Sequence, residues 1–276
     1  MLISVLWDVD PEIFTIFGRE IRWYGVLWAT GVMLTAYVVQ RMYKAEKLPE
    51  SWFDSLFMYV IIGLIIGARL GHCLFYDPER YLSSPLEMLK IWEGGLSSHG
   101  GAIGMLIGIW LFCLRVSKKS VIWALDRLIV GVAIGATFIR LGNLMNSEIY
   151  GAATTLPWGF SFVQDDKWGG LPCHPTQIYE ALVYFSLFLL GMYMYWRTNA
   201  KEKQGLILGV MLIGIFLSRF FIEFIKNIQE PFEQTMRETI GIDMGQLLSL
   251  PFVIWGVWLV YNALKKGKTN SIKTKK

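Results

Sequence analysis

Three arginines of this sequence lie where hydrocarbon would surround them, and arginine side chains bind anions. Arg69, Arg140 and Arg219 each lie inside or at the end of a long apolar run, and Glu223 is the one obvious acid beside them. Ionisable groups are costly in hydrocarbon and usually functional there. A guanidinium offers two parallel donors to a phosphate. The uncompensated positive charge therefore predicts an anionic ligand, and the apolar surroundings favour a phospholipid headgroup.

The elements that carry these arginines are predicted to be membrane-spanning helices. The chain is 54% hydrophobic and only 17% charged, with a mean hydropathy of +0.43, which indicates a polytopic membrane protein. Backbone groups in lipid must bond within their own segment, so spans of about 20 residues are helices. We expect an all-α fold with seven transmembrane helices. They lie near residues 22–42, 55–76, 97–115, 121–145, 177–196, 205–225 and 246–264.

The distribution of basic residues predicts which way the chain crosses the membrane. The loops after the first, third and fifth spans, together with the tail, carry fifteen lysines and arginines, against seven in the opposite loops. Basic residues favour the cytoplasmic side. We therefore expect the N-terminus outside and the C-terminus in the cytoplasm, with no removable signal peptide at the start. The net charge of +4 comes mostly from the tail, so no nucleic-acid partner is expected.

The same reasoning predicts one transmembrane helical domain over residues 1–264. It begins with a short N-terminal outer arm and contains an outer loop at 146–176, rich in Gly and Pro. This loop is the only one long enough to form a lid. Residues 265–276 are predicted to be a solvated, basic cytoplasmic tail.

Polar side chains from five predicted helices converge on the outer half of the membrane. Arg69 lies seven residues before Tyr76, or about 10 Å of helix, and Arg140, Arg219 and Glu223 lie at similar depths. His99 and Tyr24 open helices at the outer surface. The alternative to a ligand site is a buried polar network, in which Arg219 and Glu223 pair across one turn. Asp126 and Arg127 lie near the cytoplasmic end instead, where we expect a structural role.

Glycines recur with small-xxx-small spacing in two predicted helices, at residues 63–71 and 100–108. This spacing predicts close helix packing. Gly100 has a second interpretation, because it follows His99 at a helix start, where free backbone N–H groups favour anions. The three cysteines, at 73, 113 and 173, have no CxxC spacing, so neither a zinc site nor another metal site is predicted.

Seven motifs follow one another over essentially the whole chain. They are RWYG (22–25), GARLGHCLFY (67–76), SHGGAIG (98–104), RLGNLMNSEIYG (140–151), HPTQIYE (174–180), RFFIEF (219–224) and QLLSLP (246–251). In this order they resemble the prolipoprotein diacylglyceryl transferase family. Two positions of the central motif depart from the family pattern, because Ile139 replaces a glycine and Leu144 replaces a phenylalanine. Both changes are apolar and concern local packing more than chemistry.

The resemblance implies an activity and a location. Members transfer the diacylglyceryl group of phosphatidylglycerol to the thiol of the lipobox cysteine in a prolipoprotein signal peptide, forming a thioether and releasing glycerol phosphate. This is the first step of lipoprotein maturation. The partners would be phosphatidylglycerol, the signal peptide and membrane lipid, in a bacterial cell membrane with the active site toward the outer leaflet. Neither a cofactor nor a metal is implied.

The resemblance also suggests roles for individual residues. His99 is the leading candidate for the general base, with headgroup binding or a structural role as the alternative. Arg69 has the alternative role of a hydrogen bond between helices, and Tyr24 that of an interface residue. Glu223 is expected to fix Arg219. Predicted catalytic residues are His99, Arg140, Asn143 and Tyr24, and predicted phosphatidylglycerol-binding residues are Arg140, Arg219, Glu148, Glu223, Gly151, Arg69 and Gly100.

Two other classes of function remain open on the sequence alone. A small anion transporter or channel would use the arginines as its substrate site, but neither inverted repeats nor a polar path to the cytoplasm is visible. A membrane chaperone that binds signal peptides without catalysis is the other class. Thiol-dependent lipid transfer would distinguish the enzyme from both.

Overall fold

A computed structural model describes residues 4–90, 94–166, 168–227 and 231–273, with side chains for all of these except 231–233 and 266–273. Of the predicted basic tail, Lys265 is described with its side chain, and the last three residues lie outside the described chain.

Each of the seven predicted spans forms a helix. Six of these helices are long and apolar enough to cross a membrane, and α1 is the seventh, so the count of seven spans stays a prediction. A π-helical turn, η3 (Cys113–Ser117), continues α4. The helices are α1 (Trp23–Ala45), α2 (Glu50–Phe75), α4 (Ser98–Phe112), α5 (Val121–Met145), α6 (Thr176–Arg197), α7 (Leu206–Glu223) and α9 (Met244–Lys273).

Short elements connect these helices. Four of these elements are strands, so the expectation of an all-α fold has to be corrected there. The reason is that residues before α1 and between α5 and α6 can complete their backbone hydrogen bonds with one another. The strands are β1 (Val5–Trp7), β2 (Glu12–Ile16), β3 (Arg19–Arg22) and β4 (Phe160–Phe162). The short helices are α3 (Pro78–Ser83), η1 (Pro85–Leu89), η4 (Ala200–Glu202) and α8 (Pro231–Ile240).

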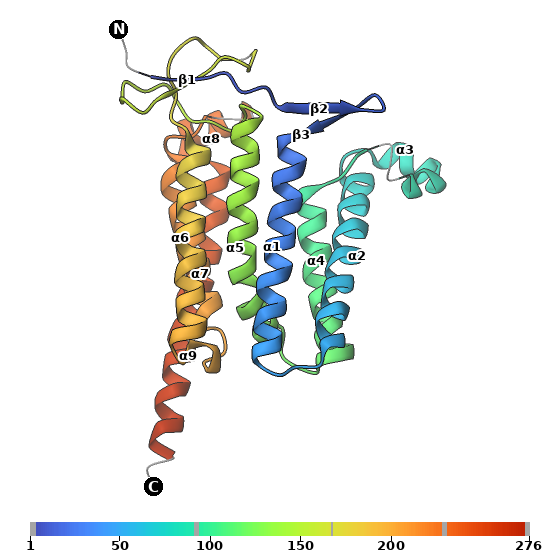
Figure 1. The fold of residues 1–276 in the computed structure, drawn as a ribbon, viewed down its shortest axis with the longest axis vertical. Coiled ribbons are helices and arrows are strands. Elements are labelled where there is room, and N and C mark those ends of the chain that lie inside the picture. Colours follow the sequence, from blue (N-terminus) through green and yellow to red (C-terminus); the bar gives the residue numbers. More distant parts are fainter. Residues whose placement is uncertain (1–3, 91–93, 167, 228–230, 274–276) are drawn as a thin grey trace. The chain divides into compact units, whose positions relative to one another are not determined.

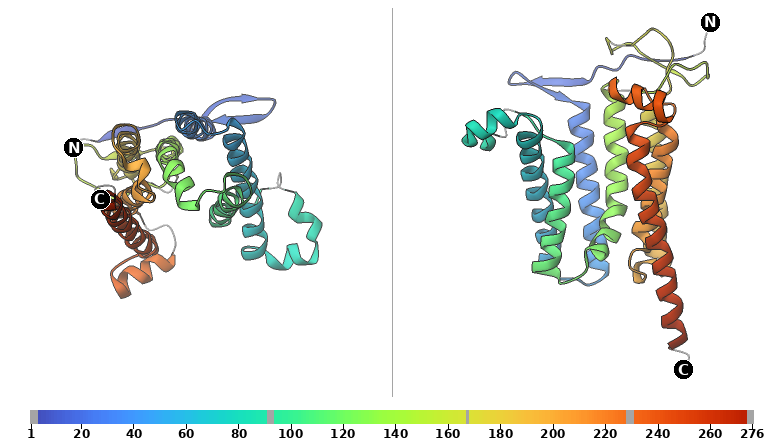
Figure 2. Two further views of the ribbon diagram at one scale, coloured as in Figure 1. Left: turned by 90° about the horizontal axis from the view of Figure 1, so that it is seen from below. Right: turned by 180° about the vertical axis from the view of Figure 1, so that it is seen from behind.

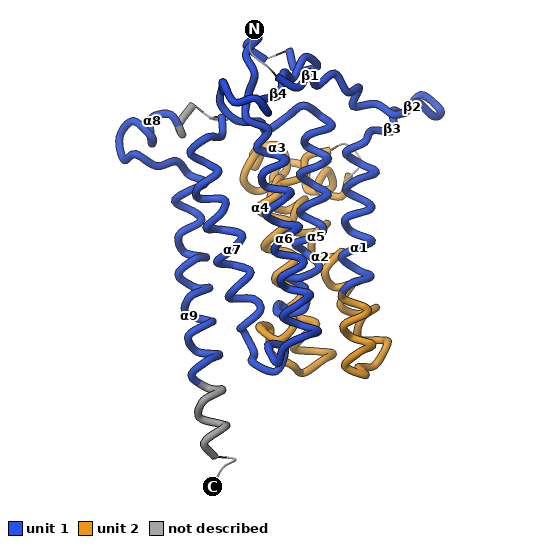
Figure 3. The backbone as a smooth tube through the Cα atoms, turned by 60° about the vertical axis from the view of Figure 1, so that its left-hand side comes forward, with its two compact units in different colours: residues 1–38, 125–276 blue, residues 39–124 orange. Residues whose placement is uncertain are grey.

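The chain forms two compact units, shown in Figure 3. Residues 1–38 and 125–276 make up unit 1, and residues 39–124 make up unit 2. Unit 1 therefore holds most of α1 and α5 and all of α6 to α9, whereas unit 2 holds α2, α3 and α4.

Close backbone approaches and buried polar contacts hold the helices of unit 1 together. The Oγ1 of Thr35 in α1 donates to the carbonyl of Gly131 in α5 at 2.8 Å. Helices α7 and α9 lie side by side (Figure 2), and a Cβ built on Gly209 would lie 2.7 Å from the carbonyl oxygen of Gly256. The carboxylate of Asp126 in α5 accepts the N–H groups of Gly205 and Leu208 at the start of α7. Asp126 thus satisfies backbone groups that a helix start leaves free.

The strands lie at one end of unit 1, and the C-terminal part of α9 points to the other end (Figure 1). Strand β1 pairs in parallel with β4, and the indole of Trp7 donates to the carbonyl of Leu144 at 3.0 Å. A small apolar cluster packs beneath them, formed by Leu144, Tyr150, Phe162 and Cys173. These contacts fix the chain just after α5, where the RLGNLMNSEIYG motif leaves its helix.

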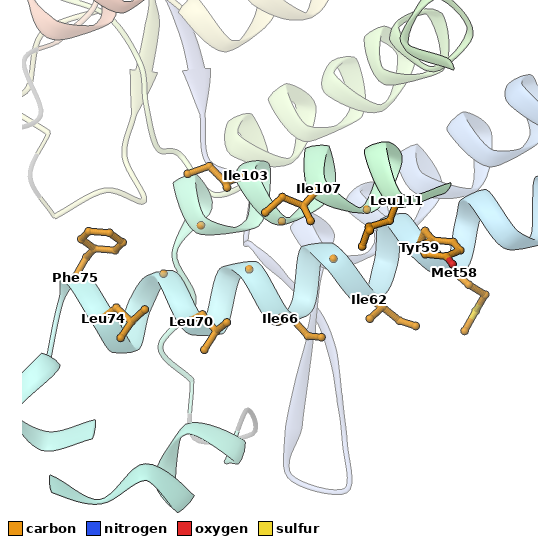
Figure 4. A pocket seen from close by; sticks show the side chains of 16 residues that line it. Met58, Tyr59, Ile62, Ile66, Leu70, Leu74, Phe75, Ile103, Ile107 and Leu111 are labelled. Atoms are coloured by element: carbon orange, nitrogen blue, oxygen red, sulfur yellow. The ribbon is translucent and has the colours of Figure 1, made fainter. Parts of the chain in front are cut away.

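Glycines bring α2 and α4 of unit 2 into backbone contact. A Cβ built on Gly104 would lie 2.0 Å from the carbonyl oxygen of Gly63, and one on Gly67 would lie 2.3 Å from that of Gly100. The helices therefore touch along their glycine faces, as the spacing predicted. Beside this contact runs an apolar groove of about 480 Å³ (Figure 4), with Ile66 and Leu70 of α2 and Ile107 of α4 among its walls.

Candidate functional site

A buried carboxylate in unit 1, Glu180 of α6, joins two cations from different elements. One of its oxygens lies 3.0 Å from Nε of Arg140 in α5, and the other lies 3.6 Å from Nζ of Lys226, just after α7. The side chains of Glu180, Lys226 and Arg140 are 1%, 6% and 16% exposed. Charges this deeply buried persist only when they are paired. Glu180 therefore sets where both cations lie.

Arg140 also begins a chain of polar contacts through the end of α5. Its Nη1 donates to Oδ1 of Asn143 at 3.2 Å, and Nδ2 of Asn143 donates to a carboxylate oxygen of Glu148 at 2.9 Å. Asn146 donates to the same oxygen, and Gln177 of α6 donates to the backbone carbonyl of Glu148 at 2.7 Å. The two asparagines therefore bind the Glu148 side chain rather than simply ending the helix.

Gly151 lies where three segments of the chain meet. A Cβ built there would lie 2.4 Å from the carbonyl oxygen of Ile225, 2.8 Å from Thr176 and 2.9 Å from His174. Its N–H donates to the carbonyl of His174, and it forms a bridge with Lys226. The structural need for glycine is this close approach, since Gly151 is not among the residues with positive φ.

Tyr24 lies against the same part of α5. A Cβ built on Gly142 would meet the Tyr24 ring at 2.9 Å. Gly142 is two residues from Arg140 in the helix, and Tyr24 is half-buried. The structure thus brings Tyr24 to the RLGN motif, and glycine at position 142 makes room for its ring.

Arg219 of α7 is the cation of this region without a partner. It interacts electrostatically with Glu223 and Tyr184, but within the described residues it makes neither an ion pair nor a hydrogen bond. The predicted pairing of Glu223 with Arg219 is therefore not what the structure shows. Glu223 lies 3.7 Å from Nζ of Lys226 instead, and its carboxylate packs against Gly245 of α9.

The arrangement is suited to holding an anion at the end of unit 1. Glu180 and Glu223 take up the charges of Arg140 and Lys226, while the half-buried guanidinium of Arg219 remains available. A desolvated guanidinium binds a phosphate oxygen strongly because little water competes with it. Among the described residues there is no group of three or more His, Cys, Asp or Glu side chains that could hold a metal ion.

Unit 2 holds the other predicted site residues, and Arg69 has a different environment there. Its guanidinium, on a residue 3% exposed, donates to the backbone carbonyls of Glu87, Met88, Gly94 and Gly95. These bonds occupy Nε and both terminal nitrogens. The predicted alternative, a structural hydrogen bond, matches this geometry, although the partner is a connecting segment rather than a helix.

His99 and Gly100 lie in the first turn of α4. The His99 side chain is exposed and makes no hydrogen bond, ion pair or ring contact within the described part of the chain. The N–H of Gly100 donates to Oγ of Ser97 at 3.2 Å, so Ser97 caps the helix and this N–H is not free for an anion. Gly100 itself packs against Gly67, which is the helix-packing role that its spacing predicted.

The loop before α6 carries groups whose environment disfavours charge. Burial raises the pKa of the Cys173 thiol and lowers the pKa of His174. Burial and the Asp165 carboxylate together raise the pKa of Tyr150, whose hydroxyl donates to Asp165 at 2.6 Å. His174 binds the segment after Gly151 through its backbone. These groups hold the loop, and an uncharged Cys173 thiol is a poor nucleophile.

Sequence reasoning missed Glu180 and Lys226, although both were visible. Glu180 ends the HPTQIYE motif one turn inside an apolar helix, and an acid at that position was a signal of a buried ion pair. Lys226 follows Glu223 by three residues, a spacing that permits pairing on one helix face. In the sequence analysis Lys226 was counted only among the seven basic residues of the loops opposite the tail. The sequence-based prediction of an anion site considered three arginines and Glu223. The structure adds one acid, Glu180, and one cation, Lys226, to this group.

Comparison with known proteins agrees with the motifs. The profile of the prolipoprotein diacylglyceryl transferase family matches residues 11–262. A phosphatidylglycerol–prolipoprotein diacylglyceryl transferase of Porphyromonas gingivalis is 52% identical over 97% of this chain and 98% of its own. Proteins of the same name from Bacteroides fragilis and Chloroherpeton thalassium are 43% and 40% identical, over 99% and 96% of both chains. The chain belongs to the prolipoprotein diacylglyceryl transferase family.

Proposed function

We propose that this protein transfers the diacylglyceryl group of phosphatidylglycerol to the thiol of the lipobox cysteine in a prolipoprotein signal peptide. The thiolate sulfur attacks the glyceryl carbon that carries the phosphate ester. A carbon–sulfur bond forms, the carbon–oxygen bond breaks, and glycerol phosphate leaves with the electron pair. The product is a thioether. Family membership and the names of the close relatives support this reaction.

The observation that carries the proposal is the unpartnered guanidinium of Arg219 among buried ion pairs. The leaving phosphate gains negative charge as its ester bond breaks, so a positioned cation stabilises the transition state more than the bound lipid. Arg219 interacts electrostatically with Glu223 and Tyr184 and has no ionic partner within the described residues. A phosphodiester is the kind of anion that suits such a site.

Arg140 supplies the second donor to the phosphate. Its Nε faces Glu180 and its Nη1 binds Asn143. These two contacts fix the orientation of the planar guanidinium and therefore of its remaining N–H groups. A fixed guanidinium needs little reorganisation when charge develops. Asn143 acts on the reaction through this contact, and Tyr24, packed on Gly142, borders the same site. Glu148 orients the asparagines or binds the glycerol hydroxyls of the headgroup.

His99 accepts the proton of the lipobox thiol in this scheme. A thiol has a pKa of about 8.5, and the thiolate is the attacking species, so a neutral imidazole beside it raises the reactive fraction. Exposure of the His99 side chain leaves it accessible. The headgroup roles predicted for Gly100 and Arg69 are less favoured, since their donors are used by Ser97 and by backbone carbonyls.

The protein crosses a bacterial cell membrane seven times in this proposal, with α1 as the first span and the N-terminus outside. The site then faces the outer leaflet. Single cysteines in place of Gly169 and Lys203 test this, because the three native thiols are buried. An impermeant thiol reagent should label position 169 in intact cells and leave position 203 unlabelled. Labelling at position 203 alone would show that the orientation is the opposite of the one proposed.

The activity itself is tested with purified protein, radiolabelled phosphatidylglycerol and a lipobox peptide. The matched control is the same peptide with its cysteine replaced by serine. We expect label on the cysteine peptide alone. Uptake of label by neither peptide, with folded protein, would reject the proposal and leave the anion transporter or the chaperone.

A further inference from the structure

We propose that Arg69 is a positioning residue for His99, because it binds the backbone of the segment that leads into α4. The inference rests on the proposed function, because it gives His99 the role of accepting the thiol proton. All the contacts that carry it lie within unit 2. It assigns to Arg69 a role different from the lipid contact predicted from the sequence.

Arg69 binds the connecting segment at two places. Its Nε and Nη2 donate to the carbonyls of Met88 and Glu87 at 2.9 and 2.8 Å. Its Nη1 donates to the carbonyls of Gly94 and Gly95 at 2.5 and 3.2 Å. The planar fork of an arginine can serve several carbonyls at once, whereas a lysine offers a single point charge. Arg69 itself is 3% exposed, so its guanidinium depends on these carbonyls for its hydrogen bonds.

Neighbours of Arg69 reinforce this attachment. The guanidinium lies over the ring of Tyr81, 5.0 Å from its centroid. The residue before Arg69, Ala68, accepts the N–H of Ser97 at 2.9 Å. Gly95 has a φ of 74° and would meet His72 at 2.5 Å if it carried a Cβ. The chain between Gly94 and Ser97 is therefore bound to one turn of α2 by backbone and side chain together.

His99 follows this attachment directly and is held on its other side as well. Ser97 caps α4 by accepting the N–H of Gly100. A Cβ on Gly100 would lie 2.3 Å from the carbonyl oxygen of Gly67, so α4 packs directly on the backbone of α2 at that point. The short span from Gly95 to Gly100 is thus fixed at both ends. The exposed imidazole of His99 makes no hydrogen bond, ion pair or ring contact among the described residues, so these two attachments are the ones that position it.

The consequence concerns the rate of the chemical step rather than lipid binding. A proton acceptor displaced by about 1 Å can cost about 100-fold in rate. If Arg69 bound the phosphate directly, its loss would weaken the binding of phosphatidylglycerol instead. The two roles therefore predict different changes in kcat and KM.

The test compares Arg69→Lys with the wild type, alone and in a His99→Gln background. We expect Arg69→Lys to lower kcat at least about tenfold and to leave KM for phosphatidylglycerol within about twofold. In the His99→Gln background the same change should have no further effect on kcat. A rise in KM with kcat retained would overturn the proposal, and so would an equal loss of kcat in both backgrounds.

Two further variants guard against a general loss of folding. Ser97→Ala removes the helix cap, usually at a cost of about 1 kcal/mol, and should reproduce the kcat effect in weaker form and with the same dependence on His99. Arg80→Lys is the matched control, because Arg80 is an exposed arginine of α3, in the connection between α2 and α4, and is paired with Glu87. It should change neither kcat nor KM.

A measurement without catalysis separates this proposal from the proposed function. Amide hydrogen exchange over residues 94–101 should be faster in Arg69→Lys than in the wild type, and unchanged in Arg80→Lys. Unaltered exchange in Arg69→Lys would overturn the proposal even if the enzyme transfers lipid. Absence of thiol-dependent transfer by the wild type would instead reject the proposed function and with it the role of His99.

Discussion

Nε of Arg140 lies 3.0 Å from the carboxylate of Glu180, and this ion pair joins α5 to α6 inside the part of unit 1 that carries most of the predicted site. The pair changes the interpretation of Arg140. The sequence presents it as an uncompensated charge, whereas the structure shows a guanidinium already held on one side by an acid.

Replacement of Glu180 by Gln should therefore damage both the site and the fold. Removing one partner of a buried ion pair commonly costs about 3–5 kcal/mol, because the remaining charge is left without compensation. Arg140 would lose its ionic partner, and Lys226 would keep only Glu223. We expect a lower midpoint of thermal unfolding in detergent and a large loss of transfer. Glu87→Gln is the control, since Glu87 forms exposed ion pairs, and unchanged stability in Glu180→Gln would contradict the account.

The two site arginines should differ in how they affect stability. Arg219→Lys removes bidentate phosphate binding without breaking an ion pair, so we expect about a 100-fold loss of kcat with unchanged thermal stability. Arg140→Lys should lower both activity and stability, because it disturbs the contacts to Glu180 and Asn143. Transfer rates and melting curves on the two variants check this. Full activity in both would remove the arginines from the phosphate site.

Gly151→Ala should be strongly destabilising for its size. The added methyl group would lie 2.4 Å from the carbonyl oxygen of Ile225 and would also press on Thr176 and His174. Overpacking of this kind costs about 1–3 kcal/mol. Gly169→Ala is the matched control in the same loop, because a Cβ there meets nothing within 4 Å. Equal melting temperatures for the two variants would show that the three segments do not meet at Gly151.

The loop at residues 146–176 should lose stability in mild acid. Burial lowers the pKa of His174 below its ordinary value of 6.5, so the unfolded chain takes up the proton first as the pH falls. The stabilising effect of neutral His174 is therefore complete above pH 6.5 and declines below it. Thermal unfolding between about pH 7.5 and 5.5 measures this. The decline should be smaller in His174→Gln, and an identical pH dependence in that variant would assign it to other groups.

The sequence predicted the helices well and the partners of the site residues poorly, for a physical reason. Long apolar runs and glycine spacing are local signals, and both appear as helices and as the contact of α2 with α4. Ion pairs depend on which helices meet, so nothing local could pair Arg140 with Glu180. The spacing of Arg219 and Glu223 suggested a pair, but Lys226 competes for the same carboxylate.

The short strands show the same limit. Residues 5–7 and 160–162 pair although they are far apart in the sequence, and three-residue strands leave no periodic pattern to detect. The hydrogen bonds of Arg69 could not be predicted either, because their acceptors are backbone carbonyls, which every residue type has. Its charge alone suggested a ligand, whereas in the structure it donates hydrogen bonds to the backbone of a connecting segment.

The most direct test of the proposed reaction follows the two halves of phosphatidylglycerol separately. The lipid carries one radiolabel in the diacylglyceryl group and another in the headgroup glycerol, and it is incubated with the protein and a lipobox peptide. The account predicts the first label on the peptide and the second in water-soluble glycerol phosphate, in equal amounts. Both labels on the peptide, or release of the headgroup without modification of the peptide, would contradict it.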